Sequence, residues 1–266
     1  MALPSGNVVF LFFFLCACAA EAQPLSAPGE IPVLFSDHHA DHGPWLLDQA
    51  GNERAALVVV DAHADTAPNN AGGFSGNHNW IHPLVSRPVD SLVWISGISG
   101  FPAAARYEGF VRSTAGWNIQ KPRCVSLDEL GTVSPGNSLL FVSIDLDFFY
   151  QDTLTPRDIP FVFDRLLEFS LRWPGNTVWA VCVSSAWLPN SEYAWEVLEQ
   201  SLAWLSSKTE FAVPVLTLFS SSLRDSSRRA RYFRSLGLEA PGLYQKADAA
   251  PERIRLLLEQ LAGPRE

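Results

Sequence analysis

Short apolar runs that alternate with longer amphipathic segments set the fold of this chain. In the run at 57–60 every position is apolar, and most of the other runs show the same continuity. That pattern is typical of strands buried on both faces of a parallel sheet, where helices cover each face. We therefore expect an α/β fold with three layers, α/β/α, built around a mainly parallel sheet.

The runs predict six strands and the amphipathic segments predict five helices. The expected strands are 31–35, 57–60, 91–95, 138–144, 177–183 and 211–218. The expected helices are 42–50, 157–173, 191–206, 222–236 and 251–261. A linker rich in Pro, Ala and Ser occupies 23–30, and no later stretch marks a boundary, so 31–266 is expected to form a single domain.

The composition excludes several classes of protein. Hydrophobic residues make up 47% of the chain and charged residues 18%, below the roughly 25% of an average soluble domain, so a disordered chain is excluded. Acidic residues outnumber basic ones by 28 to 19, which gives a formal net charge of −9. Because the chain lacks the basic footprint of a nucleic-acid binder, we expect no nucleic-acid partner and a small-molecule substrate instead. The oligomeric state stays open.

The N-terminus is typical of an export signal. The apolar run at 8–20 is too short to span a membrane, which takes about 20 residues, but it suits the hydrophobic region of a signal peptide. An Ala-x-Ala pattern predicts cleavage after Ala22; alternatively, Cys18 lies in a segment like a bacterial lipobox and would carry a lipid. We expect an exported protein, secreted or periplasmic, that meets a membrane only through such a lipid or an uncleaved leader.

The two cysteines of the body, Cys124 and Cys182, lie far apart and without C-x-x-C spacing, which argues against a thiolate zinc site. They could pair in an oxidising compartment. Buried free thiols are the favoured interpretation, because unpaired cysteine is among the most buried residue types.

Two apolar runs end in paired carboxylates. Residues 61–65 read DAHAD and residues 143–147 read SIDLD. In open α/β sheets the functional site lies beyond the carboxyl ends of the strands, so these acids are expected to meet there. Like charges buried together are costly, and a divalent cation is the usual compensation. Carboxylate and imidazole ligands without thiolate suit Mn²⁺, Fe²⁺ or Zn²⁺, and the excess of carboxylate favours Mn²⁺.

DAHAD and SIDLD resemble the two metal-binding signatures, DAHxD and SxDxD, of the arginase/deacetylase (ureohydrolase) superfamily. The body of the chain, including NHNWIHP at 77–83 and DLDFF at 145–149, is similar to the uncharacterised UPF0489 family, a distant branch of that fold. The resemblance implies an arginase/deacetylase-like domain with two divalent metal ions.

The resemblance also implies a set of metal ligands. They are His38, Asp61, His63, Asp65, Asp145 and Asp147. In this arrangement Asp61 and Asp145 bridge the two ions, His38 and Asp65 complete one site, and the remaining two ligands complete the other. His39 is the alternative to His38, since the chain carries two histidines in a row where the superfamily has one Asp-His pair.

The resemblance implies a catalytic proton carrier as well. His78 lies 13 residues after Asp65, and Ser75 and Asn77 before it fall on a segment that helps ureohydrolases hold substrate. Glu192 is a loose candidate for the acid that pairs with a guanidinium in arginases. The Asp-Pro that follows SxDxD in ureohydrolases is absent here, so the identity of the substrate stays open.

Three functions follow as expectations. The first is hydrolysis of a non-peptide C–N bond of a guanidine, amidine or amide by a hydroxide that two metal ions activate. The second is deacetylase-like hydrolysis at a single Zn²⁺, and the third is an exported protein that binds metal without catalysis. The tryptophans, Trp187 among them, are expected mostly in the core, and His42 and His82 are expected to be surface or structural residues.

Overall fold

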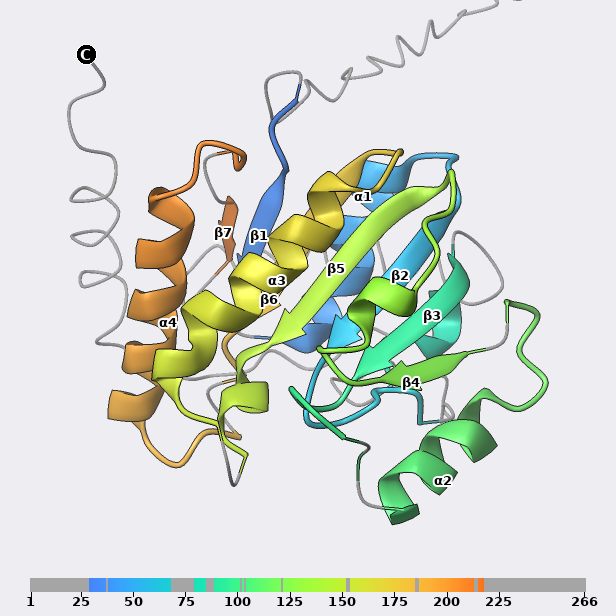
Figure 1. The fold of residues 1–266 in the computed structure, drawn as a ribbon, viewed down its shortest axis with the longest axis horizontal. Helices are drawn as coiled ribbons and strands as arrows, with labels where there is room; N and C mark the ends of the chain where they lie inside the picture. Colours follow the sequence, from blue (N-terminus) through green and yellow to red (C-terminus); the bar gives the residue numbers. More distant parts are fainter. Residues whose placement is uncertain are drawn as a thin grey trace, which may run out of the picture.

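The computed structural model of the protein describes residues 29–36, 38–67, 79–84, 89–100, 102, 104–120, 122–151, 154–184, 187–212 and 215–217. Their strands form one seven-stranded sheet in the order β4-β3-β2-β5-β6-β1-β7, with every pairing parallel (Figure 1). The strands are β1 (Val33–Ser36), β2 (Ala55–Val60), β3 (Val89–Ile95), β4 (Arg123–Val125), β5 (Leu139–Asp145), β6 (Thr177–Cys182) and β7 (Val215–Thr217). The helices are α1 (His42–Ala50), α2 (Ala104–Thr114), α3 (Ile159–Leu171) and α4 (Ser191–Ser206).

Helices cover both faces of the sheet, as the continuous apolar runs predict. In β2, Val58 and Val60 pack into a core shared with α3 and α4, whereas Leu57 and Val59 pack into a second core with α1 and with Phe110 of α2. Alternate residues of a strand point to opposite faces, so a strand between two cores must be apolar at every position. The predicted three-layer α/β class is confirmed.

Most expected elements are present. Helices α1 and α4 begin and end where predicted. Helix α3 is two residues shorter than predicted at each end, and at its start a 3-10 turn, η5 (Pro156–Asp158), takes the place of the first residues. Two elements were not predicted, α2 and the three-residue edge strand β4. The helices expected at 222–236 and 251–261, the leader expected at 1–22 and residues 23–28 of the linker lie outside the described residues, so the single domain at 31–266 stays a prediction.

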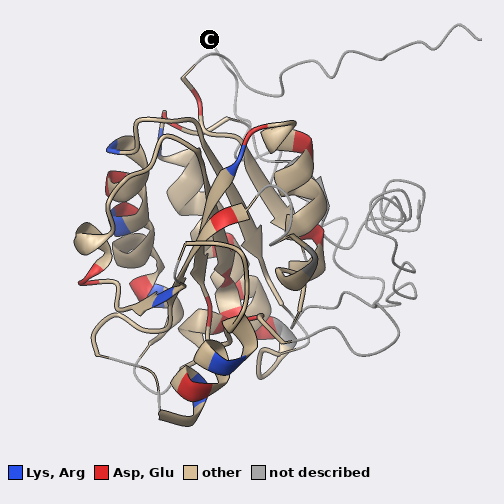
Figure 2. Ribbon diagram, turned by 90° about the vertical axis from the view of Figure 1, so that its right-hand side faces the viewer, with Lys and Arg blue, Asp and Glu red and all other residues tan. Residues whose placement is uncertain are grey.

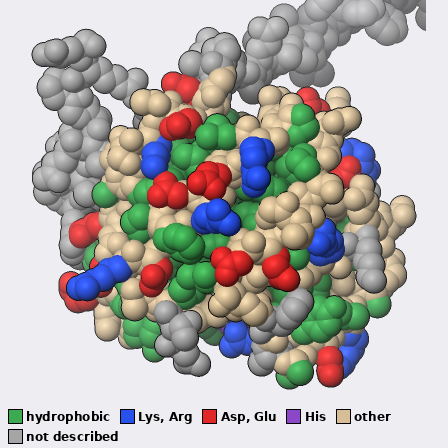
Figure 3. Space-filling view, viewed as in Figure 1, with side chains coloured by type: hydrophobic (Ala, Val, Ile, Leu, Met, Phe, Trp, Pro, Cys, Tyr) green, Lys and Arg blue, Asp and Glu red, His purple; other side chains and the backbone are tan. Residues whose placement is uncertain are grey.

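The surface over α3 and α4 mixes both signs of charge. Acidic and basic side chains are interspersed there with apolar ones (Figure 3). Among the described helices, none has the length and apolar character needed to cross a bilayer. Neither body cysteine forms a disulfide, as the favoured interpretation predicts; Cys182 is buried and Cys124 is half-buried.

Candidate metal centre

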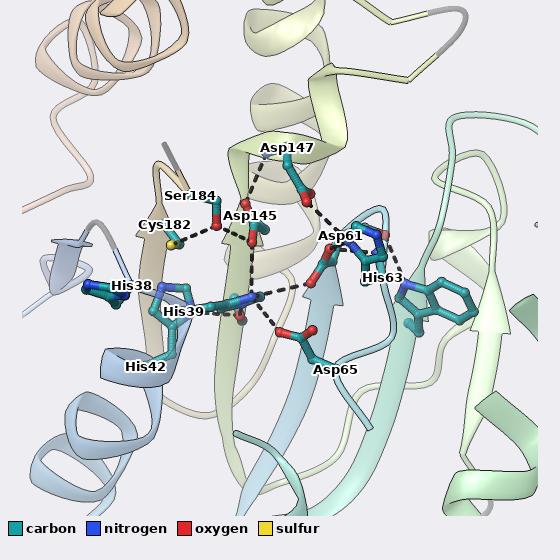
Figure 4. A network of polar contacts seen from close by, with 12 residues as sticks. His38, His39, His42, Asp61, His63, Asp65, Asp145, Asp147, Cys182 and Ser184 are labelled. Carbon is teal, nitrogen blue, oxygen red and sulfur yellow. Dashed lines mark hydrogen bonds and ion pairs between the residues drawn. The ribbon is translucent and has the colours of Figure 1, made fainter. Parts of the chain in front are cut away.

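Four aspartates and two histidines meet where β2, β5 and β1 end (Figure 4). They are His39, Asp61, His63, Asp65, Asp145 and Asp147. Five of the six are buried, and the side chain of His63 is 55% exposed. The predicted meeting of the two carboxylate pairs at one end of the sheet is thus what the structure shows.

One half of the cluster surrounds His39. Its Nδ1 lies 2.7 Å from Asp65 Oδ2, 3.2 Å from Asp145 Oδ2 and 3.4 Å from Asp61 Oδ2. A single ring nitrogen carries at most one proton, so it cannot donate a good hydrogen bond to three oxygens at once. Donor atoms that converge in this way form the kind of group that could hold a metal ion.

The other half surrounds His63. Its Nδ1 lies 3.2 Å from Asp147 Oδ2 and 3.8 Å from Asp61 Oδ1. The candidate ligand atoms of His63, Asp61 and Asp147 lie within 4.8 Å of one another, as do those of His39, Asp61 and Asp65. Asp61 therefore belongs to both groups, with one carboxylate between two candidate sites.

The same local turn holds each carboxylate pair. Asp61 Oδ1 accepts a hydrogen bond from the backbone N–H of His63 at 2.7 Å, and Asp145 Oδ1 accepts one from the backbone N–H of Asp147 at 3.0 Å. Aspartate favours such turns because its side chain can bond the backbone two residues on. In both motifs this bond turns the chain at the strand end, beside the candidate ligand two residues on, His63 in DAHAD and Asp147 in SIDLD.

In the parts of the chain that the structure describes, the carboxylates of the cluster are paired with histidines alone. No lysine or arginine there forms an ion pair with these aspartates. Asp61 Oδ2 and Asp147 Oδ1 are buried and accept no hydrogen bond. Burial, together with the charges of neighbouring carboxylates, raises the pKa of Asp61 well above its ordinary value, and the pKa of Asp147 rises for the same reasons.

The pKa of His39 is raised even though its ring is buried. Burial by itself would lower its pKa, but the charge of Asp65 and hydrogen bonds to Asp145 and Asp65 raise the pKa to about 10. The protonated ring thus takes the place of a cation among the carboxylates. Divalent ions would serve the same electrostatic purpose with more charge.

The histidine in the cluster is His39, not His38. In Figure 4 the ring of His38 lies apart from the carboxylates and that of His39 points among them. His38 has an extended backbone, with φ −129° and ψ 122°, and the 3-10 helix η1 (His39–Asp41) begins directly after it. The change of direction at this point turns the second histidine inward, so the ligand role predicted for His38 fits its alternative, His39.

A buried relay of hydrogen bonds lies behind His39. Its Nε2 is 2.9 Å from Ser143 Oγ, which is 2.8 Å from Nδ1 of His42, and the ring of Trp80 lies 5.1 Å from that of His39. Burial lowers the pKa of His42 well below its ordinary value, which keeps that ring neutral. The relay fixes the orientation of His39, and such outer partners tune a ligand's position. His42 thus has the structural role expected of it.

Two residues at the cluster have a left-handed backbone. Asp65 has φ 50° and Ser184 has φ 49°. Ser184 Oγ donates a hydrogen bond of 2.6 Å to Asp145 Oδ2 and lies 3.2 Å from Cys182 Sγ. Sequence reasoning missed Ser184, because no local pattern marks a serine that the fold holds in this conformation.

A cavity of about 580 Å³ opens over the cluster. Asp65, Asp145 and Asp147 line it together with one side of α2 and Trp187. Its size is that of a small-molecule site. The side chain of Trp187 is 58% exposed and its ring lies 6.1 Å from that of His63, so the expectation that this tryptophan belongs to the core is wrong.

The residues predicted to hold substrate or to carry the proton are not among those that the structure places at the cluster. Ser75, Asn77 and His78 lie outside the described residues. Glu192 is exposed in the first turn of α4 and is not one of the described residues that line the cavity. The structure therefore does not bring Glu192 to the cluster.

Comparisons with known proteins give distant structural similarity alone. Neither a protein family nor a curated protein matches the sequence, so membership of UPF0489 stays a prediction. Similar solved structures include proclavaminate amidino hydrolase from Streptomyces clavuligerus (20% identity, TM-score 0.41), formimidoylglutamase from Bacillus subtilis (16%, 0.37) and arginase from Helicobacter pylori (15%, 0.39). These matches cover 65%, 66% and 66% of this chain, which spans 61%, 61% and 73% of theirs.

Proposed function

We propose that this chain is a metal-dependent hydrolase that cleaves a non-peptide C–N bond, of a guanidine, amidine or amide, with two divalent cations. The observation that carries the proposal is the shared position of Asp61, whose two oxygens face two separate groups of ligand atoms. The resemblance of DAHAD and SIDLD to the ureohydrolase signatures supports the choice of bond. The leader expected at 1–22 makes export part of the proposal.

The donor set fits two such ions. Four carboxylates carry a charge of about −4 when ionised, and two divalent cations would balance it, whereas buried carboxylates without a counter-charge are strongly disfavoured. Oxygen-rich sites with imidazole suit Mn²⁺ best, with Zn²⁺ or Fe²⁺ possible. Asp61 would lie between the ions, His39, Asp65 and Asp145 would hold one, and His63 with Asp147 would hold the other.

The chemistry divides between the ions and the chain. Divalent cations at this position supply Lewis acidity and lower the pKa of water, which the hydrolysis of an unactivated C–N bond requires. Ser184 and Ser143 hold Asp145 and His39 in place. The half-exposed ring of His63 lines the cavity, where Trp187 offers a flat wall to a planar group of the substrate. In this proposal His78 carries the proton to the leaving amine.

Elemental analysis of the purified protein after loading with Mn²⁺ tests the proposal first. We expect two ions per chain, and we expect Asp61→Asn to lose both, because both groups need this carboxylate. Asp128→Asn, which removes an exposed aspartate that is not part of the cluster, is the matched control and should keep two ions. Release of ammonia, urea or a free amine from a panel of guanidines, amidines and acylated amines then tests the reaction.

Two other results would contradict the proposal. One ion per chain, with hydrolysis of acylated amines, would favour a deacetylase-like site with a single Zn²⁺. Two ions with no hydrolysis across the whole panel would favour an exported protein that binds metal without catalysis.

A further inference from the structure

We infer that α2 sets the substrate preference of the cavity, and that Arg106 and Arg112 bind an oxyanion on the part of the substrate that lies away from the aspartates. The inference rests on the proposed function, since it concerns the substrate of that same site. It adds a chemical class: a C–N compound that also carries a carboxylate or a phosphate.

Helix α2 forms one wall of the cavity. It lies at the end of the molecule toward which the strands point, as both ribbon views show (Figures 1 and 2). Arg106 and Arg112 line the same cavity as Asp65, Asp145 and Asp147. Arg106 Nη1 donates a hydrogen bond of 3.2 Å to the carbonyl oxygen of Ala62, within DAHAD. This bond holds the first guanidinium between α2 and the loop of the candidate metal ligands.

The charges of the cavity leave these two arginines unbalanced. With two divalent cations bound, about +4 would cancel the charge of the four ionised aspartates. Within the described residues, no carboxylate forms an ion pair with Arg106 or Arg112. Guanidinium groups bind carboxylate and phosphate through paired hydrogen bonds. An anionic group on the substrate would complete the charge of the cavity, whereas a second cationic group would be repelled.

A glycine between the arginines keeps this wall open. Gly109 lines the cavity from the interior of α2, where glycine is unfavourable for helix stability. A Cβ atom built at this position would meet nothing within 4 Å, so packing against the protein does not require glycine. The absent side chain leaves room in the cavity between Arg106 and Arg112.

Calorimetric titration of the Mn²⁺-loaded protein tests the inference with three matched compounds. They are N-acetyl-β-alanine, its phosphate counterpart N-acetyl-aminoethyl phosphate, and the neutral N-acetyl-β-alaninamide. We expect at least one anion to bind more tightly than the neutral amide. Arg106→Gln and Arg112→Gln should each weaken that anion about fivefold, as expected for exposed charge pairs, and leave the amide unchanged. The matched control is Arg165→Gln, at an exposed position of α3.

Because Arg106 also holds the Ala62 loop, Arg112→Gln is the cleaner variant. Equal affinity for all three compounds overturns the inference. A preference for the anion that survives both substitutions overturns it as well, since the anion would then lie on the metal ions. The metal content of each variant, measured separately, distinguishes these outcomes from a failure of the proposed function. If the purified chain binds no metal, the proposed function is wrong. The dependence of anion binding on Arg106 and Arg112 can still be measured in that case.

Discussion

At the scale of single residues, the cluster holds two backbone conformations that ordinary residues avoid. A left-handed conformation costs a residue other than glycine roughly 1 kcal/mol or more, and it persists only where the surroundings enforce it. Asp65 and Ser184 both adopt it, and both contact the same group of aspartates and His39. The conformation of Ser184 directs its hydroxyl to Asp145, so the strain has an identifiable result.

Ser184→Ala removes that hydroxyl and keeps the strained backbone. We expect Mn²⁺ affinity to fall by about 10- to 100-fold, the usual loss when the partner of a metal ligand is removed. Ser184→Gly should lose affinity to the same extent but unfold at a higher temperature than Ser184→Ala, because glycine tolerates this φ. Titration with Mn²⁺ and thermal melting measure both effects; an unchanged affinity would show that Asp145 needs no help from Ser184.

Replacing His38 and His39 in turn gives a second test at the residue scale. His39→Ala should reduce the bound ions to one or fewer per chain, because it removes the nitrogen that faces Asp61, Asp65 and Asp145. His38→Ala should keep two, since its ring lies apart from the carboxylates. Elemental analysis of the two variants side by side decides the assignment, and the reverse pattern would restore the prediction of His38.

The sequence predicted the aspartates better than their partners. Asp61 and Asp145 stand where an apolar run ends, which places them at strand ends, and in a parallel sheet these ends meet at one edge. The choice between His38 and His39 depends on where a 3-10 helix begins, and the role of Ser184 depends on contacts across the sheet. Neither is encoded in local spacing.

At the scale of elements, α2 differs from the other helices. Only Phe110 and Thr114 are buried in it, and the ring of Phe110 lies 5.3 Å from that of Trp94 in β3. α2 has an apolar periodicity like that of α1 and α4 but is less apolar overall, so its sequence carries little sign of a packed helix, which is why sequence reasoning missed it. By contrast, α3 buries seven residues and was predicted from its pattern. The edge strand β4 was missed because three residues carry no period.

Replacing Phe110, the buried aromatic residue of α2, should destabilise this helix without affecting the sheet. In Phe110→Ala we expect amide hydrogen exchange to accelerate across 104–114, while β2 and β5 keep their protection, because the loss of a buried aromatic costs about 3 to 5 kcal/mol and falls on this element. Mass spectrometry of exchanged peptides measures it. Uniformly faster exchange through the sheet would show that α2 is part of the global folding unit.

At the scale of the whole molecule, the cluster makes stability depend on pH. Burial and neighbouring charges raise the pKa of Asp61, Asp65 and Asp147, so the metal-free folded protein binds more protons than the unfolded chain above pH 3.8. The stability that the raised pKa of His39 contributes is complete below pH 6.5 and is lost as pH rises through about 10. Both effects have the same sign. The lowered pKa of His42 acts in the opposite direction, but only below about pH 6.5, so stability should fall as pH rises above that value.

Thermal melting in EDTA should therefore give a lower Tm at about pH 9 than at about pH 7, and Mn²⁺ should raise the Tm most at the higher pH, where the ligands are deprotonated. Asp61→Asn should show a smaller dependence on pH in EDTA. A Tm that rises with pH in metal-free protein would contradict the assigned direction.

The order of the sheet also bears on how the chain is made. β1 lies between β6 and β7 in the sheet, and residue 34 of β1 pairs with residue 180 of β6. The first strand of the chain can therefore pair only after the sixth has been synthesised. Pairing across so long a stretch is slow to form. During synthesis DAHAD and SIDLD are made before β6, the strand that pairs with β1 just ahead of His39. A nascent chain that has not yet reached residue 177 therefore carries the aspartates without their histidine in position, and the site closes only late in translation.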